Sequence, residues 1–195
     1  MKRIGLTGGI ASGKSLISNF FEEKNVIVLD ADKIYKNLLK TNKILYNEIK
    51  KEFNFKELDL QQLANIVFND ETKLNRLNKI THPFVIRSFT EQLKKLARTE
   101  KLIVLDIPLL FEAKMEDFCD EVICVYVDEE IQKQRLVERN KLSEEEALNR
   151  IKSQMPLSEK CKLSDYVIDN SQDIKYAYEQ FEQIFQKIKE SIHVI

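Results

Sequence analysis

The chain has 195 residues, 43% hydrophobic and 32% charged, and its 31 basic and 32 acidic side chains give a formal net charge of −1. This length predicts one compact domain with room for a small inserted lobe. The balanced charge gives no electrostatic reason to expect a nucleic acid or an acidic membrane as a partner.

The sequence also favours a cytoplasmic protein. No run approaches the roughly eighteen consecutive apolar residues that a membrane helix needs, and the N-terminus lacks the apolar core of a signal peptide. The three cysteines (Cys119, Cys124 and Cys161) cannot all pair and lack zinc-ligand spacing, so we expect reduced thiols. No obligatory protein partner is evident.

Glycine is scarce and confined to one end of the chain. Average usage of about 7% would give roughly 14 glycines at this length, but only Gly5, Gly8, Gly9 and Gly13 are present. GTPase switches and ABC-type ATPases need glycines in later motifs, and the dinucleotide-binding pattern G-x-G-x-x-G does not occur. The composition therefore excludes these classes.

Five short apolar runs, at residues 4–7, 26–29, 102–105, 122–127 and 166–168, predict strands. Their near-continuous apolar character is typical of a parallel sheet that is covered on both faces. Amphipathic helical segments lie between them, and the clearest carries one apolar stripe from Ile174 to Ile192. The alternation predicts a three-layer α/β fold.

A phosphate-binding loop follows the first strand. The segment Gly8, Gly9, Ile10, Ala11, Ser12, Gly13, Lys14 and Ser15 matches G-x-x-x-x-G-K-[ST] in full. The glycines let backbone N–H groups point at a polyphosphate, Lys14 supplies a cation for the β- and γ-phosphates, and Ser15 supplies a hydroxyl for Mg²⁺. The N-terminus of the following helix adds its positive dipole end. The motif predicts nucleoside triphosphate binding.

Two acidic positions end neighbouring strands. Asp30 and Asp32 close the second strand, and Asp32 is our candidate for the base that receives a proton from an acceptor hydroxyl. Asp106 closes the third strand and is the candidate contact for Mg²⁺, directly or through water. The alternative is structural in both cases: a helix cap with a surface acid at 30–32, and a turn cap before Pro108.

The alternation of strands and helices is interrupted between the second and third strands. Residues 37–100 contain helical patterns at 44–53, 60–68 and 74–96, which predict an inserted lobe that binds an acceptor. We expect Pro83 to interrupt the last of these helices and His82 beside it to face the cleft, although a structural histidine is the alternative reading.

Residues 139–162 predict a second helical excursion, a lid. Ser143 and Glu146 form a capping box, and Arg139 and Arg150 have the planar groups that suit the charge of a phosphoryl-transfer transition state, with solvated helix arginines as the alternative. Since glycine is absent here, we expect helices to end on Asn25, Asn54 and Asn140.

Once GTPase switches, ABC-type ATPases and dinucleotide-binding proteins are excluded, the class of nucleotide-binding protein that remains is a small-molecule kinase.

The chain resembles the dephospho-coenzyme A kinase family. The resemblance is carried by residues 6–15, 29–32, 77–83, 107–112, 147–156 and 165–171, and it runs in order from about residue 3 to residue 190. The Thr-His-Pro, Pro-Leu-Leu-Phe-Glu and Gln-Met-Pro segments are more diagnostic together than the phosphate loop, which many kinases share.

The resemblance implies a P-loop kinase fold, with a five-stranded parallel sheet in the order 2-3-1-4-5. The nucleotide-binding core would span 1–36, 101–138 and 163–195, the acceptor lobe 37–100 and the lid 139–162. The reaction would transfer the γ-phosphate of ATP to the 3′-hydroxyl of the ribose of dephospho-CoA, with Mg²⁺. Two alternatives are another small-molecule P-loop kinase, of the nucleotide or shikimate type, and a nucleotide-binding regulatory module.

The resemblance also implies residue roles. Asp32 would be the base, with Lys14 and the lid residue Arg139 as the other catalytic groups, and Ser15 and Asp106 would hold the metal. The remaining predicted contacts are, for ATP, the loop from Gly8 to Ser15 with Leu16, Arg139 and Asn170, and, for the acceptor, Asp32, His82, Pro83 and Leu109. Ala11, Leu16 and Leu60 depart from the common family pattern, and Leu60 leaves the acceptor contacts least defined.

Overall fold

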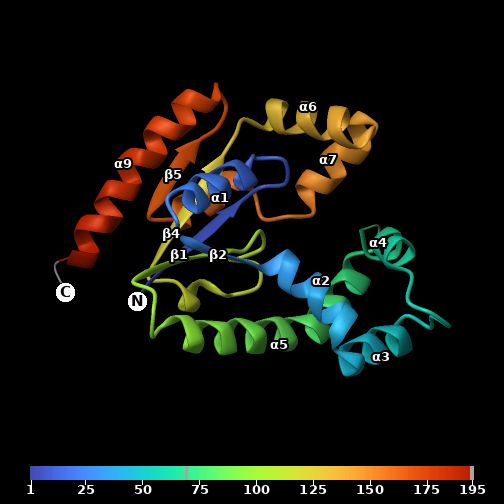
Figure 1. Cartoon of the computed structure of the whole chain (residues 1–195). Coiled ribbons are helices and arrows are strands. Elements are labelled where there is room, and N and C mark those ends of the chain that lie inside the picture. The colour runs from blue at the N-terminus through green and yellow to red at the C-terminus, as the bar shows by residue number, and fades with distance from the viewer. Residues whose placement is uncertain (69, 194–195) are drawn as a thin grey trace. The chain divides into compact units, whose positions relative to one another are not determined.

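A computed structural model describes residues 1–68 and 70–193 (Figure 1). Residues 69, 194 and 195, which fall in the predicted ranges 37–100 and 163–195, lie outside the described part of the chain. The chain separates into two compact units, Met1–Leu29 with Glu100–Ile195 and Asp30–Thr99. Residues 37–99 fall in the second unit and residues 139–162 in the first, while the predicted division into core, acceptor lobe and lid stays a prediction.

The first unit is built on a parallel sheet. Its strands in the described residues are β1 (Lys2–Gly8), β2 (Ile27–Asp30), β3 (Leu102–Asp106), β4 (Glu121–Tyr126) and β5 (Tyr166–Asp169), in the order β2-β3-β1-β4-β5. Both the five predicted strands and their predicted order are confirmed. Because β1 pairs with β3 and β4 on either side, its carboxyl end lies at the centre of the sheet edge.

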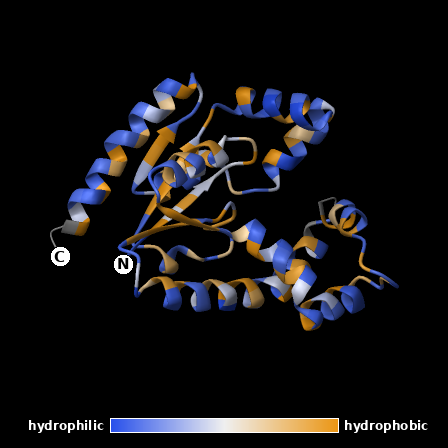
Figure 2. Ribbon diagram, viewed as in Figure 1, coloured by the Kyte–Doolittle hydropathy of each residue, from blue (hydrophilic) through white to orange (hydrophobic). Residues whose placement is uncertain are grey.

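Two helices cover one face of this sheet. Helices α1 (Lys14–Glu23) and α9 (Ile174–His193) pack with Ile4, Leu6 and the neighbouring strands in one buried cluster. The rings of Phe21 and Phe181 meet edge to face, with centroids 4.8 Å apart. Hydrophobic and hydrophilic residues alternate along α9 (Figure 2), as expected for a helix with one face on the core.

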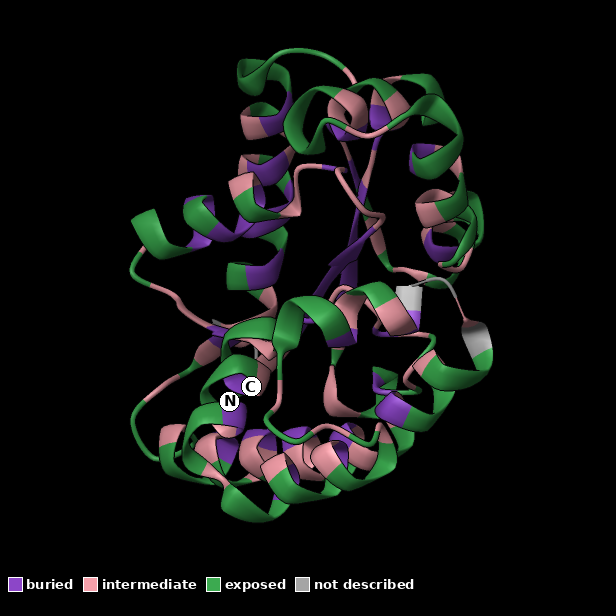
Figure 3. Ribbon diagram, turned by 90° about the vertical axis from the view of Figure 1, so that its right-hand side faces the viewer, coloured by how far each residue is buried: buried purple, intermediate pink, exposed green. Residues whose placement is uncertain are grey.

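The opposite face of β1 is covered by the segment after β3. A Cβ atom on Gly5 would lie 2.7 Å from Cys119 Sγ and 2.8 Å from Leu110 Cδ1, so a larger residue would displace these two side chains. The short 3₁₀ helix η1 (Glu116–Phe118) lies in that segment, and α8 (Leu157–Leu163) packs against β4 and β1. Buried residues are concentrated in the strands (Figure 3). The sheet therefore forms the central layer of three.

Helices α6 (Glu129–Asn140) and α7 (Glu144–Lys152) complete the first unit. The predicted capping box is confirmed, since Ser143 Oγ accepts from the amide of Glu146 and Glu146 accepts from the amide of Ser143. Asn25 and Asn54 have positive φ angles of 59° and 54°, as predicted. Helix α6 ends at Asn140, as predicted, but Asn140 itself is helical and its Oδ1 accepts from Arg139 Nε; the exposed Lys141 takes the left-handed conformation one residue later.

The second unit is helical in its described residues after Asp30. It contains α2 (Ala31–Thr41), α3 (Lys43–Glu52), α4 (Leu60–Phe68) and α5 (Glu71–Leu96). These helices surround their own apolar core, formed by Leu39, Leu45, Ile49, Leu63, Val67 and Leu77.

The predicted interruption at Pro83 is wrong, because α5 continues through it from Glu71 to Leu96. A proline inside a helix removes one backbone N–H and crowds the preceding turn. Buried side chains on both sides of Pro83, among them Leu77 and Phe89, hold the helix in place against that cost.

No helix among the described residues is long and apolar enough to cross a membrane.

Candidate active site

The phosphate-binding loop connects the carboxyl end of β1 to the first turn of α1. Ser12 N donates to Gly9 O at 3.1 Å and Leu16 N donates to Gly13 O at 2.9 Å, which closes the turn. Gly13 has φ of 86°, and the Asn170 amide occupies the space that a Cβ atom would need there. Ala11 also has a positive φ, 58°, a backbone conformation that glycine adopts at lower cost than alanine.

Side chains from distant segments hold the backbone of this loop. Gln132 Nε2 donates to Ile10 O at 2.6 Å, Gln154 Oε1 accepts from Ile10 N at 2.9 Å, and Asn170 Nδ2 donates to Ser12 O at 2.8 Å. Arg135 in turn donates to the carbonyl of Asn170 at 3.0 Å. The loop is therefore fixed from α6, from the segment after α7 and from the end of β5.

The side chain of Asn170 thus has a structural partner. It is only 5% exposed and its amide is engaged with the loop backbone, while its role as an ATP contact stays a prediction. The sequence did not point to Gln132 or Arg135, and Gln154 entered only as part of the Gln-Met-Pro segment, without this contact. Gln132 is only 3% exposed. A glutamine at a position that the amphipathic pattern predicts to be buried was the one available signal for it.

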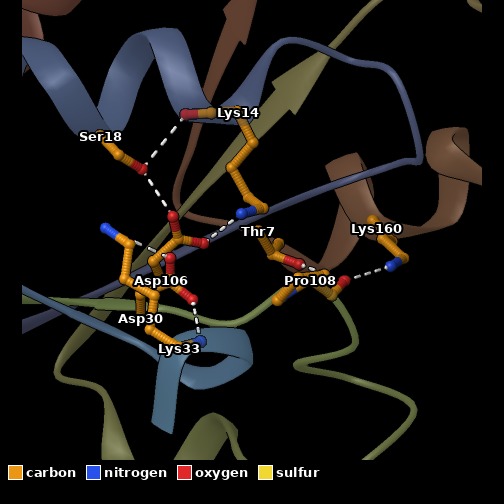
Figure 4. Close-up of polar contacts among 8 residues, drawn as sticks. All are labelled: Thr7, Lys14, Ser18, Asp30, Lys33, Asp106, Pro108 and Lys160. Carbon is orange, nitrogen blue, oxygen red and sulfur yellow. Dashed lines mark hydrogen bonds and ion pairs between the residues drawn. The ribbon is translucent and has the colours of Figure 1, made fainter. Parts of the chain in front are cut away.

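Lys14 and Asp106 form an ion pair beside the loop (Figure 4). The Asp106 carboxylate is only 4% exposed, and its second oxygen accepts from Ser18 Oγ at 2.6 Å. Ser18 lies four residues after Lys14 and therefore on the same face of α1. The structure brings the predicted residues Lys14 and Asp106 together and adds Ser18, which the sequence reading missed although the spacing of four was its available signal.

The oxygen donors here fit Mg²⁺. Ser15 lies in the first turn of α1 and Asp106 ends β3, so a hydroxyl and a carboxylate come from two segments that the Lys14–Asp106 pair connects. Mg²⁺ is commonly held by one or two such protein groups together with substrate phosphates and water. Among the described residues no group of three His, Cys, Asp or Glu side chains forms a metal cage of its own.

Asp30 and Asp32 lie at the start of α2, in the second unit. Asp30 is the N-cap, since its Oδ1 accepts from the amide of Lys33 at 2.9 Å (Figure 4), and this is the structural role that the sequence left open. Asp32 is exposed in the first turn of α2.

His82 and Pro83 lie on consecutive positions of α5 in the same unit. His82 is half-buried, and burial lowers the pKa of its imidazole. Leu60 is the first residue of α4 and is exposed. Leu109 belongs to the first unit and is half-buried in the segment after β3.

Arg139 lies in the last turn of α6, where its Nε donates to Asn140 Oδ1 at 3.0 Å, and Arg150 lies on α7. The two arginines therefore occupy different helices. Arg139 is exposed, and its role toward ATP stays a prediction.

Comparison with known proteins identifies the family of the chain. The dephospho-CoA kinase family matches residues 2–176. A dephospho-CoA kinase of Carboxydothermus hydrogenoformans is 46% identical over 193 residues, covering 95% of this chain and 94% of that protein.

Two solved structures extend the likeness to the fold. A protein of Thermus thermophilus has a TM-score of 0.81 at 31% identity, covering 95% of this chain and 97% of its own. The dephospho-CoA kinase from Campylobacter jejuni has a TM-score of 0.73 at 30% identity, covering 98% and 99%. The predicted P-loop kinase fold is confirmed, and the chain belongs to the dephospho-CoA kinase family.

Proposed function

We propose that the protein transfers the γ-phosphate of ATP to the 3′-hydroxyl of the ribose of dephospho-CoA, which yields coenzyme A and ADP. The observation that carries the proposal is family membership along nearly the whole chain, joined to an intact phosphate-binding loop. In the reaction the 3′-oxygen bonds to the γ-phosphorus, the bond from that phosphorus to the β–γ bridging oxygen breaks, and ADP leaves.

Lys14 is proposed to exchange partners when ATP binds. In the free protein its ammonium is paired with Asp106. The γ-phosphate and the β-phosphate carry more negative charge than one carboxylate, so the Lys14 ammonium leaves Asp106 and pairs with them. There it neutralises the charge that develops as ADP leaves. The loop needs no rearrangement for this step, since Gln132, Gln154 and Asn170 already fix its backbone.

Ser15 and Asp106 are the residues proposed to hold Mg²⁺. When it is bound, the metal screens the phosphate charges and orients them for in-line transfer. Release of Lys14 frees one oxygen of Asp106 for this task, while Ser18 keeps the other oxygen in place.

Asp32 is proposed to accept the proton of the 3′-hydroxyl as the new bond forms. It belongs to the unit that we propose as the acceptor lobe, with His82 and Pro83 as further contacts. That unit carries 14 basic and 9 acidic side chains, a formal charge of +5. A cationic lobe favours the approach of an acceptor that carries a pyrophosphate.

Residues 139–162 are proposed as the lid, with Arg139 contacting the transferring phosphate. Leu109 is proposed as an acceptor contact, and Ile10, Leu16 and Asn170 complete the proposed ATP contacts. We place the reaction in the cytoplasm, since the three cysteines are free thiols, the state that a reducing compartment maintains.

The test is a coupled assay of ADP release with ATP, Mg²⁺ and a panel of acceptors: dephospho-CoA, nucleoside monophosphates and shikimate. We expect stimulation by dephospho-CoA alone. Stimulation by another member of the panel and none by dephospho-CoA would overturn the proposal.

A further inference from the structure

The proposed reaction leaves one buried charge without a use. Lys160 on α8 has a fully buried side chain, 0% exposed, in a chain whose other lysines mostly face solvent. Taking an ammonium group out of water is costly unless it is paired and hydrogen-bonded. The partners of Lys160 therefore indicate its role.

Lys160 Nζ has two partners from the segment after β3. It donates to Pro108 O at 2.8 Å and pairs with Glu112 Oε1 at 2.9 Å. Pro108 stands two residues after Asp106, the partner of Lys14, and Figure 4 shows the Lys160 contact in the same view as that pair. One ammonium group therefore fixes both ends of residues 108–112.

Each partner of Lys160 has a second contact near the phosphate-binding loop. Pro108 O also accepts from Thr7 Oγ1 at 3.1 Å, and Thr7 directly precedes Gly8. Glu112 Oε1 also accepts from the amide of Met155 at 3.0 Å, and the preceding residue, Gln154, binds Ile10 N. The contacts form a ring that joins the entry of the loop, the segment after β3 and the segment before α8.

The segment 108–112 depends on this ring more than the phosphate-binding loop does. The backbone hydrogen bonds of Ala113, Lys114 and Met115 stay within residues 109–115, so apart from the buried side chain of Leu110, which packs against β1, they give the segment no anchor on the sheet. The loop, in contrast, is held independently by Gln132 and Asn170. Loss of Lys160 should therefore loosen the segment and leave the loop nearly intact.

We propose that Lys160 is a positioning residue that holds the segment 108–112 in place for the acceptor. The inference rests on the proposed function, since it assigns Leu109 in this segment to acceptor binding. Lys160 touches neither substrate; it acts through the carbonyl of Pro108 and the carboxylate of Glu112.

The test is the double variant Lys160→Met with Glu112→Gln, which leaves no buried charge unpaired and keeps an acceptor for the amide of Met155. Its matched control is Lys162→Met with Glu159→Gln, which removes an exposed pair on the same helix, 2.8 Å apart. We expect the KM for dephospho-CoA to rise about tenfold, with the KM for ATP within about twofold of wild type. The control should match wild type.

Hydrogen exchange gives a second readout that does not depend on activity. The amides of Ala113, Lys114 and Met115 should exchange faster in the Lys160 variant, while those of β1 and β4 should not change. Unchanged exchange together with an unchanged acceptor KM, or equal rises in both KM values, would overturn the proposal. If the double variant does not fold, the same two KM values and the same exchange rates are measured for Glu112→Gln alone and compared with wild type. A wild-type protein inactive on dephospho-CoA would instead refute the proposed function, and the exchange experiment would still test Lys160.

Discussion

The two units of the chain are stabilised in different ways and carry opposite charge. The unit with the sheet has 17 basic and 23 acidic side chains, a formal charge of −6, whereas the helical unit has a charge of +5. The near-neutral total of the whole chain hides this asymmetry. The difference fits the function that we propose. In it the unit with the sheet binds the nucleotide with fixed hydrogen-bond donors, and the helical unit attracts the anionic acceptor.

The side-chain hydrogen bonds of the two units also differ, in how far apart in sequence their partners lie. In the first unit, Gln132, Gln154 and Asn170 reach the phosphate-binding loop from more than 100 residues away in sequence. In the second unit the side-chain contacts are mainly local helix caps, such as those of Asn42 and Asp70, around an apolar core. We therefore expect substitutions in the first unit to disturb geometry at the loop, and most polar substitutions in the second to change only stability.

The largest expected effect is that of Lys14→Met. Removal of the ammonium withdraws charge stabilisation where ADP departs, so kcat should fall by about 10³-fold. A coupled assay of ADP release measures it. Lys24→Met, at the other end of α1, serves as the control and should retain nearly full activity; a kcat of Lys14→Met within tenfold of wild type would contradict the assignment.

Asp32→Asn should have the next largest effect, because the amide cannot accept the proton of the acceptor hydroxyl. We expect turnover to fall by about 10²-fold or more, with ATP affinity, measured by calorimetry, nearly retained. Asp70→Asn, which keeps a capping side chain at the start of α5, is the control from the same unit. Near-normal turnover in Asp32→Asn would remove Asp32 from the role of base.

Ser18→Ala should have a smaller effect that is specific to the metal. Without the hydroxyl the second oxygen of Asp106 loses its partner, so the Mg²⁺ concentration for half-maximal activity should rise about tenfold. Binding of ATP measured without Mg²⁺ should change little. Asn19→Ala, at an exposed position on α1, is the control; an unchanged Mg²⁺ dependence in Ser18→Ala would show that Asp106 is held without Ser18.

The smallest expected effect comes from the second unit. Asn42 Oδ1 accepts from the amides of Ile44 and Leu45 at the start of α3, at 3.1 and 3.0 Å. Asn42→Ala should lower the free energy of unfolding by about 1 kcal/mol without changing kcat. Denaturant unfolding measures the change, and Glu48→Ala on the exposed face of α3 is the control. A loss of kcat would contradict a purely structural role for this cap.

Much of the first unit was predictable because its signals are local. Each strand is a continuous apolar run, the phosphate-binding loop is a complete motif, and the carboxylate that ends β3 follows directly from the strand pattern. Asn25 and Asn54 were predictable as helix ends because the absence of glycine leaves few residues that favour a positive φ.

The contacts that hold the site were not predictable, because they join residues far apart in sequence. Gln132, Arg135 and Lys160 are single polar residues on amphipathic helices, and nothing in their spacing shows which backbone group they reach. Pro83 was misread for the opposite reason: a strong local signal for a helix break is overridden by packing along the whole of α5. The proposal that this unit binds the acceptor rests more on family resemblance than on any motif.

The most direct measurement of the central claim compares dephospho-CoA with its 3′-deoxy analogue as acceptors for the wild-type protein. We predict ADP release with dephospho-CoA, together with a product that carries one new phosphate on the 3′-oxygen by phosphorus NMR, and no stimulated release with the analogue. Equal ADP release with both acceptors, or a new phosphate at any other position, would contradict phosphoryl transfer to the 3′-hydroxyl.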